Sequence, residues 1–336
     1  MDTNSNLAKL IGNTPILKVP SLSRISKSDI YLKCESFNPG GSIKDRAALK
    51  MVENAMKRGD LKPGMTIVEG TAGNTGIGLA LVAKSFGLKM KAVMPKGQAL
   101  EKERMLELFG AELLLVDPVP FANENHFYHT AKRLGEEPNH WWANQFENED
   151  NYLAHYEHTA PEIVSQLDSN LDFFVCAAGT GGTIGGNSKY LKEHIPNVKT
   201  YLVDPAGSGL DSFLKTGEFK ATGSSITEGI GIMRETHNFS QSILDGSFSI
   251  DDSIIVSLAR YVRDQDGIIL GSSSALNLAA AFKLALTNPN SSVLTFMCDL
   301  GERSYSKMFN DDFLREKGIS HTIKIEEIQS KLSGLS

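Results

Sequence analysis

Short apolar runs alternate with longer segments of helical spacing along most of this chain, and this alternation constrains the fold more than any other feature. The apolar runs have the length of buried strands and lie at 30–34, 66–70, 91–95, 112–116, 173–178, 200–203 and 292–297. The clearest helical segments between them lie at 43–59, 74–87, 101–111 and 273–287. Strands separated by helices of this length are typical of βαβ units, so the sequence predicts an α/β protein with mostly parallel sheets.

A polar, irregular stretch at 117–150 interrupts this pattern and indicates a crossing between two lobes. The 336 residues suffice for one large domain or two of moderate size. The charged tail after about residue 311 is predicted to be a surface helix or extension.

Charge and hydropathy argue against several classes of function. A net charge of −6 without a basic run argues against nucleic acid as the main partner. No apolar run approaches the ~18–20 residues of a membrane helix. The N-terminus has no apolar core of a secretory signal, so we expect a cytoplasmic protein. Three widely spaced cysteines, Cys34, Cys176 and Cys298, predict buried thiols rather than a disulfide framework.

Glycine-bearing stretches follow strand candidates at 69–78 and 177–186, and a third lies at 228–232. Ligands of α/β proteins bind in such loops at the carboxyl ends of strands. The stretch 179–183, GTGGT, offers up to five consecutive N–H donors and two hydroxyls at a helix start, which favours an anion. The nucleoside-triphosphate and dinucleotide fingerprints are both missing, so the sequence indicates a small phosphate or, with equal weight, a tight turn without ligand.

A single lysine, Lys44, lies just inside an expected helix start in NPGGSIKDR, residues 38–46. Ser42 is the predicted N-cap, with Asp45 completing a box-like arrangement. A helix N-terminus disfavours positive charge and so helps a lysine lose its proton. A reactive amine together with a phosphate cradle is what pyridoxal 5′-phosphate requires, although an ordinary surface lysine fits the residue types as well.

Two histidine pairs could each share a helix face, His126 with His129 and His155 with His158. Neither pair has a clear third ligand, so we predict no metal site.

Four motifs in this order resemble the cysteine synthase/cystathionine β-synthase family: NPGGSIKDR at 38–46, TAGNTG at 71–76, GTGGT at 179–183 and GIG at 229–231. The similarity runs from about residue 11 to about residue 309. It implies a fold-type II pyridoxal-phosphate enzyme with two α/β lobes, similar to the tryptophan synthase β-subunit. It also implies a large cofactor-binding lobe of residues 1–45 plus 151–336 and a small mobile substrate-binding lobe of residues 46–150.

The resemblance assigns roles to individual residues. Lys44 would form the Schiff base with the cofactor and then move the substrate's α-proton. Asn74 would bind the ring's 3′-oxygen, Gly229 would lie along the cofactor, and Ser273 would meet the pyridine nitrogen. The phosphate would be held by Gly179, Thr180, Gly181, Gly182 and Thr183. The substrate carboxylate would be held by Thr71, Ala72, Gly73, Asn74, Thr75 and Gln145.

The implied activity is β-replacement, which forms L-cysteine from O-acetyl-L-serine and sulfide through an α-aminoacrylate intermediate. Cysteine desulfhydration and the condensation of serine with homocysteine stay open, because Ala72, Ser272, Ala275 and Leu300 depart from the usual motifs. The family is typically homodimeric, and some members bind serine acetyltransferase.

Overall fold

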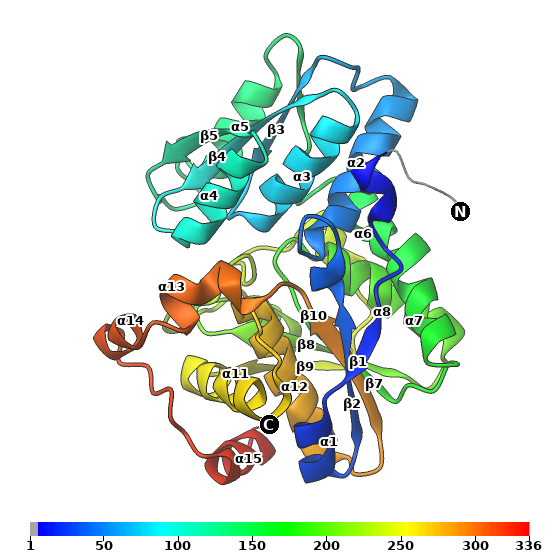
Figure 1. The fold of residues 1–336 in the computed structure, drawn as a ribbon, viewed down its shortest axis with the longest axis vertical. Coiled ribbons are helices and arrows are strands. Elements are labelled where there is room, and N and C mark those ends of the chain that lie inside the picture. Colours follow the sequence, from blue (N-terminus) through cyan, green and yellow to red (C-terminus); the bar gives the residue numbers. More distant parts are fainter. Residues whose placement is uncertain (1–5, 336) are drawn as a thin grey trace.

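Two β-sheets organise residues 6–335, the part of the chain that the computed structural model describes, and each forms the centre of one lobe (Figure 1). One sheet has four parallel strands in the order β5-β4-β3-β6. The other has six strands in the order β1-β2-β10-β7-β8-β9, and β1 alone of these six runs antiparallel to its neighbour. We call the part built on the four-stranded sheet the small lobe and the rest the large lobe.

The strands of the small lobe are β3 (Thr66–Gly70), β4 (Lys89–Pro95), β5 (Glu112–Val116) and β6 (His140–Trp142). Those of the large lobe are β1 (Ile16–Lys18), β2 (Asp29–Cys34), β7 (Phe173–Ala177), β8 (Lys199–Pro205), β9 (Gly246–Ile250) and β10 (Ser292–Met297). The seven predicted strands are confirmed. The sequence did not reveal β1 and β6, which have only three residues each, or β9, whose residues GSFSI are mostly small and polar.

The longer helices are α1 (Pro20–Ser26), α2 (Lys44–Arg58), α3 (Asn74–Ser85), α4 (Leu100–Leu108), α5 (Phe127–Gly135), α7 (Ala160–Gln166), α8 (Gly182–His194), α9 (Leu210–Thr216), α11 (Asp252–Asp266), α12 (Ser272–Thr287) and α15 (Ile325–Ser333). The shorter ones are α6 (Asp150–Ala154), α10 (His237–Ser240), α13 (Tyr305–Met308) and α14 (Asp311–Glu316), with η1 (Leu7–Leu10), η2 (Glu35–Phe37), η3 (His155–Thr159) and η4 (Gly301–Ser304). The four predicted helices correspond to α2, α3, α4 and α12. The stretch expected to be irregular, 117–150, contains α5 and β6.

The chain tail does more than run along the surface. Ile328 and Leu332 on α15 are fully buried in the large-lobe core, where α15 packs against α12. Burying two such side chains contributes roughly 3–6 kcal/mol of favourable transfer free energy. The prediction of a surface helix or extension was therefore incomplete, because the apolar positions of this last helix face inward.

The start of α2 also differs from its prediction. The helix begins at Lys44, and Ile43 occupies the N-cap position without a side-chain cap. The Ser42 hydroxyl accepts a weak bond from the Lys44 N–H at 3.3 Å, while the Asp45 carboxylate reaches back to the N–H of Gly40 at 2.6 Å. The box-like arrangement predicted for Ser42 and Asp45 was wrong, because Asp45 closes the preceding glycine turn instead.

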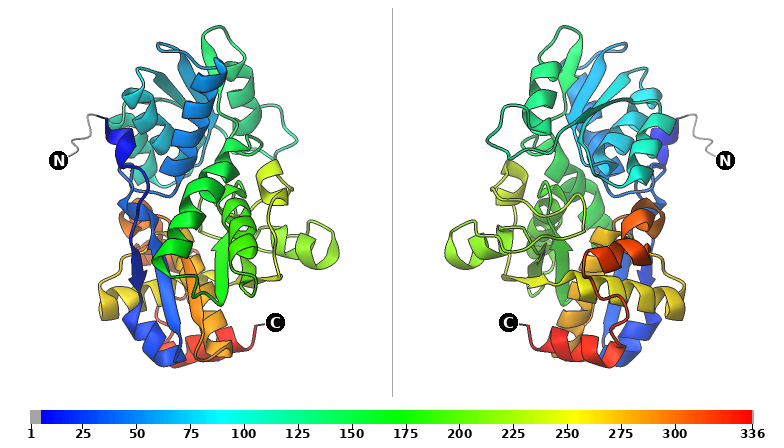
Figure 2. Two further views of the ribbon diagram at one scale, coloured as in Figure 1. Left: turned by 90° about the vertical axis from the view of Figure 1, so that its right-hand side faces the viewer. Right: turned by 90° about the vertical axis from the view of Figure 1, so that its left-hand side faces the viewer.

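The two lobes lie one above the other in both side views (Figure 2). The boundaries predicted for the lobes stay a prediction, and residues 1–5 and 336 lie outside the described residues. The small lobe is not built from 46–150 alone, since η1 packs on α3 and Asn6 donates to the carbonyl of Ser85 at 3.1 Å.

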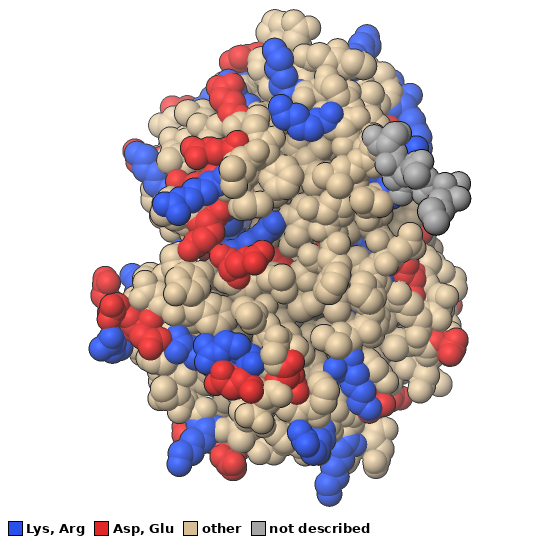
Figure 3. All heavy atoms as spheres, viewed as in Figure 1, with Lys and Arg blue, Asp and Glu red and all other residues tan. Residues whose placement is uncertain are grey.

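The surface carries both signs of charge. Basic and acidic side chains alternate over the face that Figure 3 shows, without a large patch of one sign. Within residues 6–335, no helix is both long and apolar enough to span a bilayer.

Candidate active site

A cavity lies between the lobes, where β3, β7 and β10 end and the helices α2, α3, α8 and α12 begin. It encloses about 1070 Å³, counting the space at its open mouth. All predicted site residues except Gly182 line it: Lys44, Thr71, Ala72, Gly73, Asn74, Thr75, Gln145, Gly179, Thr180, Gly181, Thr183, Gly229 and Ser273. Gly182 lies behind this wall and packs against Asn151.

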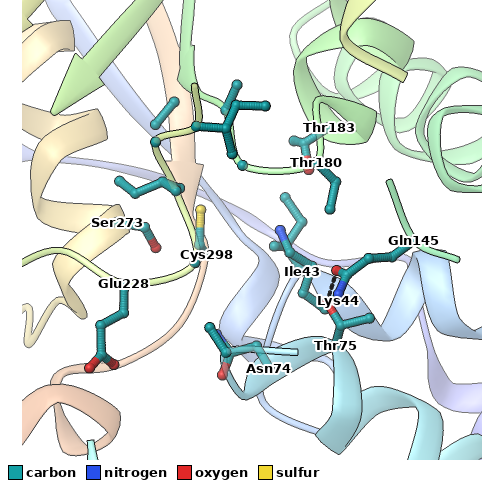
Figure 4. Close-up of a pocket in the computed structure, with 18 of the residues that line it drawn as sticks. Ile43, Lys44, Asn74, Thr75, Gln145, Thr180, Thr183, Glu228, Ser273 and Cys298 are labelled. Atoms are coloured by element: carbon teal, nitrogen blue, oxygen red, sulfur yellow. Dashed lines mark hydrogen bonds between the residues drawn. The ribbon is translucent and has the colours of Figure 1, made fainter. Parts of the chain in front are cut away.

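Lys44 is held at the crossing between the lobes. The N–H of the preceding residue, Ile43, donates to the carbonyl of Cys298 at 3.0 Å, which ties the helix start to the residue following β10. Figure 4 shows Lys44 near the middle of the cavity, with Thr180 and Thr183 on one side and Thr75 on the other. An amine in this place can reach a ligand bound by either lobe.

The turn 179–183 has the geometry of an anion cradle. Gly181 has φ +85°, and a side chain at Gly181 would overlap the backbone of Phe239. A side chain at Gly179 would overlap the carbonyl of Gly229. Only glycine fits both places. The turn leads into the N-terminus of α8, whose free N–H groups favour a negative charge.

A buried histidine supports this turn from behind. His155 lies between the hydroxyls of Thr159 at 3.0 Å and Thr183 at 3.3 Å. Burial lowers the pKa of His155 well below its ordinary value, so the ring is neutral. The sequence pattern raised His155 as a candidate metal ligand that shares a helix face with His158. In the structure its ring instead contacts Thr159 and Thr183 and supports the turn 179–183. The described residues contain no group of three potential metal ligands.

The loop 71–75 forms the opposite wall and leads into α3. The Thr71 hydroxyl accepts the N–H groups of Gly73 at 3.0 Å and Gly76 at 3.3 Å, which curls the loop around it. The Thr75 hydroxyl donates to the side-chain oxygen of Gln145 at 2.6 Å. These bonds fix the start of α3, whose N-terminus lies at the cavity and favours a negative charge there.

Asn74 connects the lobes. Its amide donates to Asp299 at 2.7 Å, and its oxygen accepts from Arg303 at 3.0 Å. Arg303 also donates to the carbonyl of Gly40. Both partners come from the DLGER segment of the large lobe, so the position of Asn74 depends on how the two lobes meet.

Ser273, in the first turn of α12, faces the cavity beside Cys298. Burial raises the pKa of Cys298 to about 12, and the nearby charge of Lys44 offsets this only in part. Cys34, Cys176 and Cys298 are free and buried, as predicted, but two of them also line the cavity.

Sequence reasoning missed the ionic contacts at the mouth. Glu228 accepts from Lys102 of α4 and from Lys307 of α13, both at 2.5 Å. The stem of Lys102 packs on Gly73, where an added side chain would come within 2.6 Å of it. Glu228 is the first residue of the EGIGI stretch and directly precedes Gly229. Its place in this glycine-bearing stretch was the one sequence feature that could have pointed to it. Its lysine partners are 126 and 79 positions away, so no local pattern could reveal them.

The donors of this cavity fit pyridoxal 5′-phosphate. The glycine turn and α8 would hold its phosphate, with the hydroxyls of Thr180 and Thr183 alongside. Lys44 would bind its aldehyde carbon, and the uncharged Ser273 hydroxyl would meet its ring nitrogen.

A family model described as pyridoxal-phosphate dependent enzyme matches residues 7–299. The chain belongs to this family. It is a fold-type II pyridoxal-phosphate enzyme, as the resemblance implied, and its cofactor is pyridoxal phosphate.

Relatives of this pyridoxal-phosphate enzyme include cysteine synthase 1 of Emericella nidulans, which is 44% identical over 95% of this chain and 88% of the relative. A solved O-acetylserine-dependent cystathionine β-synthase from Helicobacter pylori is similar with a TM-score of 0.82 and 35% identity, covering 91% of this chain and 99% of that one. A hydrogen sulfide-producing enzyme from Fusobacterium nucleatum is similar with a TM-score of 0.82 and 32% identity, covering 90% and 99%.

Proposed function

We propose that this protein is a cysteine synthase, which forms L-cysteine from O-acetyl-L-serine and sulfide. One observation carries the proposal: a single cavity brings together the Lys44 amine, the glycine turn at 179–183 and a second loop at a helix start, residues 71–75. The similarity to a named cysteine synthase and to an O-acetylserine-dependent enzyme supports the choice of donor.

The large lobe would hold the cofactor. Lys44 would bind it and, once released by the incoming amino acid, move the substrate's α-proton. Asn74 would donate to the 3′-oxygen with its second amide hydrogen, because the first is bound to Asp299. Gly229 would lie along the ring. Bound here, pyridoxal phosphate would withdraw electrons from the substrate's α-carbon, the chemistry that β-replacement requires.

Ser273 would select the reaction type. An aspartate at the pyridine nitrogen would keep that nitrogen protonated, but a neutral serine hydroxyl does not. Without the proton, the ring withdraws electrons less strongly. Loss of a β-substituent is then favoured over transamination, which agrees with a replacement reaction.

The small lobe would hold the amino acid. The N–H groups at the start of α3 and the loop residues 71–75 would bind the substrate carboxylate, with Gln145 beside them. Residues 46–150 would then close on the large lobe and exclude water. The contacts of Asn74 and Lys102 across the mouth are the kind that such closure would make and break.

We also propose a homodimer in the cytoplasm, as the family resemblance implies. Light scattering after gel filtration would measure the assembly state of the purified protein. An association with serine acetyltransferase stays a prediction, which co-elution of the two proteins would test.

The decisive experiment compares three reactions of the cofactor-loaded enzyme. We expect L-cysteine from O-acetyl-L-serine plus sulfide at a kcat/KM well above that for cystathionine from serine plus homocysteine, and above that for sulfide from cysteine. Lys44→Ala is the control that should remove all three. A dominant cystathionine product would instead identify a condensing enzyme, and a dominant release of sulfide would identify a desulfhydrase.

A further inference from the structure

Glu69 is a buried carboxylic acid that the roles given above do not use. It is the fourth residue of β3 and lies two positions before the loop 71–75. Its side chain is buried, with 1% of the residue exposed, and no ion pair of the described residues involves it. A buried acid without a cation is costly unless it is hydrogen-bonded, so its partners indicate what it does.

Those partners belong to Gln145. The carboxyl group of Glu69 accepts the side-chain amide of Gln145 at 3.0 Å and the backbone N–H of Gln145 at 3.4 Å. The second amide hydrogen of Gln145 goes to the carbonyl of Gly70 at 2.8 Å, and its oxygen accepts from Thr75 at 2.6 Å. Both ends of the Gln145 side chain are thus fixed, and Gln145 fixes the first turn of α3.

The same chain of bonds continues to the phosphate turn. Asn151 donates through its amide nitrogen to the backbone carbonyl of Gln145 at 2.7 Å and to the hydroxyl of Thr180 at 3.0 Å. A buried polar network therefore connects the acid of β3 in the small lobe with the glycine turn of the large lobe. Networks of this kind rigidify a site when every member is satisfied.

We propose that Glu69 is a positioning residue of the substrate site: it fixes Gln145, and through Gln145 it fixes Thr75 and the start of α3 where the substrate carboxylate would bind. The inference rests on the carboxylate role proposed above for residues 71–75. Burial also raises the pKa of Glu69 to about 8, so the group is largely uncharged at neutral pH and does not repel a carboxylate.

The test compares Glu69→Ala with Glu69→Gln in the cofactor-loaded enzyme. For the alanine variant we expect the KM for O-acetyl-L-serine to rise about tenfold, which corresponds to ~1.4 kcal/mol, with kcat changed less than about twofold. Glu69→Gln should stay within about threefold of the wild-type KM, because its amide oxygen can still accept from Gln145. If Glu69 only stabilised the fold, its substitution would not raise the KM while leaving kcat nearly unchanged.

Asp204 offers a matched control at the end of β8. It is also 1% exposed with a raised pKa, but its carboxylate accepts the N–H of Asp211, in the large lobe. We expect Asp204→Ala to lower the melting temperature while leaving the KM unchanged. Should Glu69→Ala fail to fold, Glu69→Asp, which shortens the reach by one methylene, must still raise the KM.

A binding measurement separates this inference from the proposed function. Calorimetric titration with L-alanine, which has a carboxylate but no leaving group, should give a Kd about tenfold higher for Glu69→Ala than for the wild type. Equal Kd values would overturn the positioning role. If the wild type forms no cysteine but the Kd still rises, the proposed function fails and the positioning role stands.

Discussion

The two loops that face each other across the cavity share one design but differ in what holds them. Residues 71–75 and 179–183 each follow a parallel strand and lead into a helix whose first turn faces the ligand. The turn 179–183 is shaped mainly by backbone packed against Gly229 and Phe239, while His155 and Asn151 only support its threonine side chains. The loop 71–75 is shaped by side chains, chiefly Thr71 and Gln145. A backbone-built cradle suits a constant cofactor, whereas a loop held by side chains can be retuned for a new substrate.

The largest effect should come from the residue between the loops. Lys44→Ala removes the amine and leaves both loops intact, so we expect cysteine formation to fall by about a thousandfold or more. The assay is product formation at saturating substrates, with cofactor content measured in parallel. Turnover near the wild-type rate would contradict the role of Lys44.

The next effect tests the backbone-built loop. Gly181→Ala places a side chain at φ +85° against Phe239, and we expect at least a tenfold weaker affinity for pyridoxal phosphate from strain of ~1–2 kcal/mol plus the clash. Fluorescence titration of cofactor-free protein would measure it. The control is Gly217→Ala, because Gly217 has φ +77° but open space around it and caps α9 at its C-terminus. Equal losses of affinity in both variants would mean that packing at Gly181 is irrelevant.

The loop built by side chains should respond differently. Gln145→Ala removes the partner of Thr75 and Glu69, so the KM for O-acetyl-L-serine should rise about tenfold while cofactor affinity changes less. Steady-state kinetics and the same cofactor titration would separate the two quantities. A larger loss of cofactor affinity than of substrate affinity would reverse the comparison.

A smaller effect is expected at the mouth. Lys102→Met keeps the apolar stem on Gly73 but removes one cation from Glu228, which retains Lys307. Because Glu228 keeps Lys307 as a second cation, we expect a KM only about two- to fivefold higher, which corresponds to ~0.5–1 kcal/mol. The pair of Lys102 and Glu228 is buried, with 4% and 7% of the two side chains exposed, so added salt should change the KM of the wild type and of the variant by similar factors. A KM equal to that of the wild type would show that this contact does not assist substrate binding.

The smallest expected effect is on how the thermal stability of the protein depends on pH. The folded pKa of Glu69, about 8, lies above the ordinary value of 4.5, so the folded state binds the extra proton between these values. The contribution of Glu69 to the free energy of unfolding is therefore greatest below pH 4.5. It decreases as the pH rises from 4.5 toward about 8. Glu69→Gln cannot titrate, so its melting temperature should fall less between pH 6 and pH 8.5 than that of the wild type. A steeper fall in the variant would contradict this.

The comparison also explains what the sequence could predict. Glycines such as Gly181 reveal a backbone-built turn, because a positive φ favours glycine and a close backbone approach leaves no room for a side chain. Apolar runs likewise revealed seven strands. The supports of the other loop could not be found this way: only the family resemblance pointed to Gln145, and its partner Glu69 is 76 positions away and looks ordinary in its own segment. Asp45 was misread for a related reason: local capping rules do not include the fold of the preceding turn.

The place of Lys44 at the crossing between the lobes has a mechanical consequence. Ile43 is tied to the residue after β10, while Ala47, Ala48 and Met51, one to two turns farther along α2, belong to the small-lobe core. A rotation of one lobe against the other would therefore have its pivot beside Lys44. The Lys44 amine would lie close to this pivot, and it would stay within reach of the cofactor while the substrate loop swings. The enzyme could then open and close around its substrate without releasing the group that performs the chemistry.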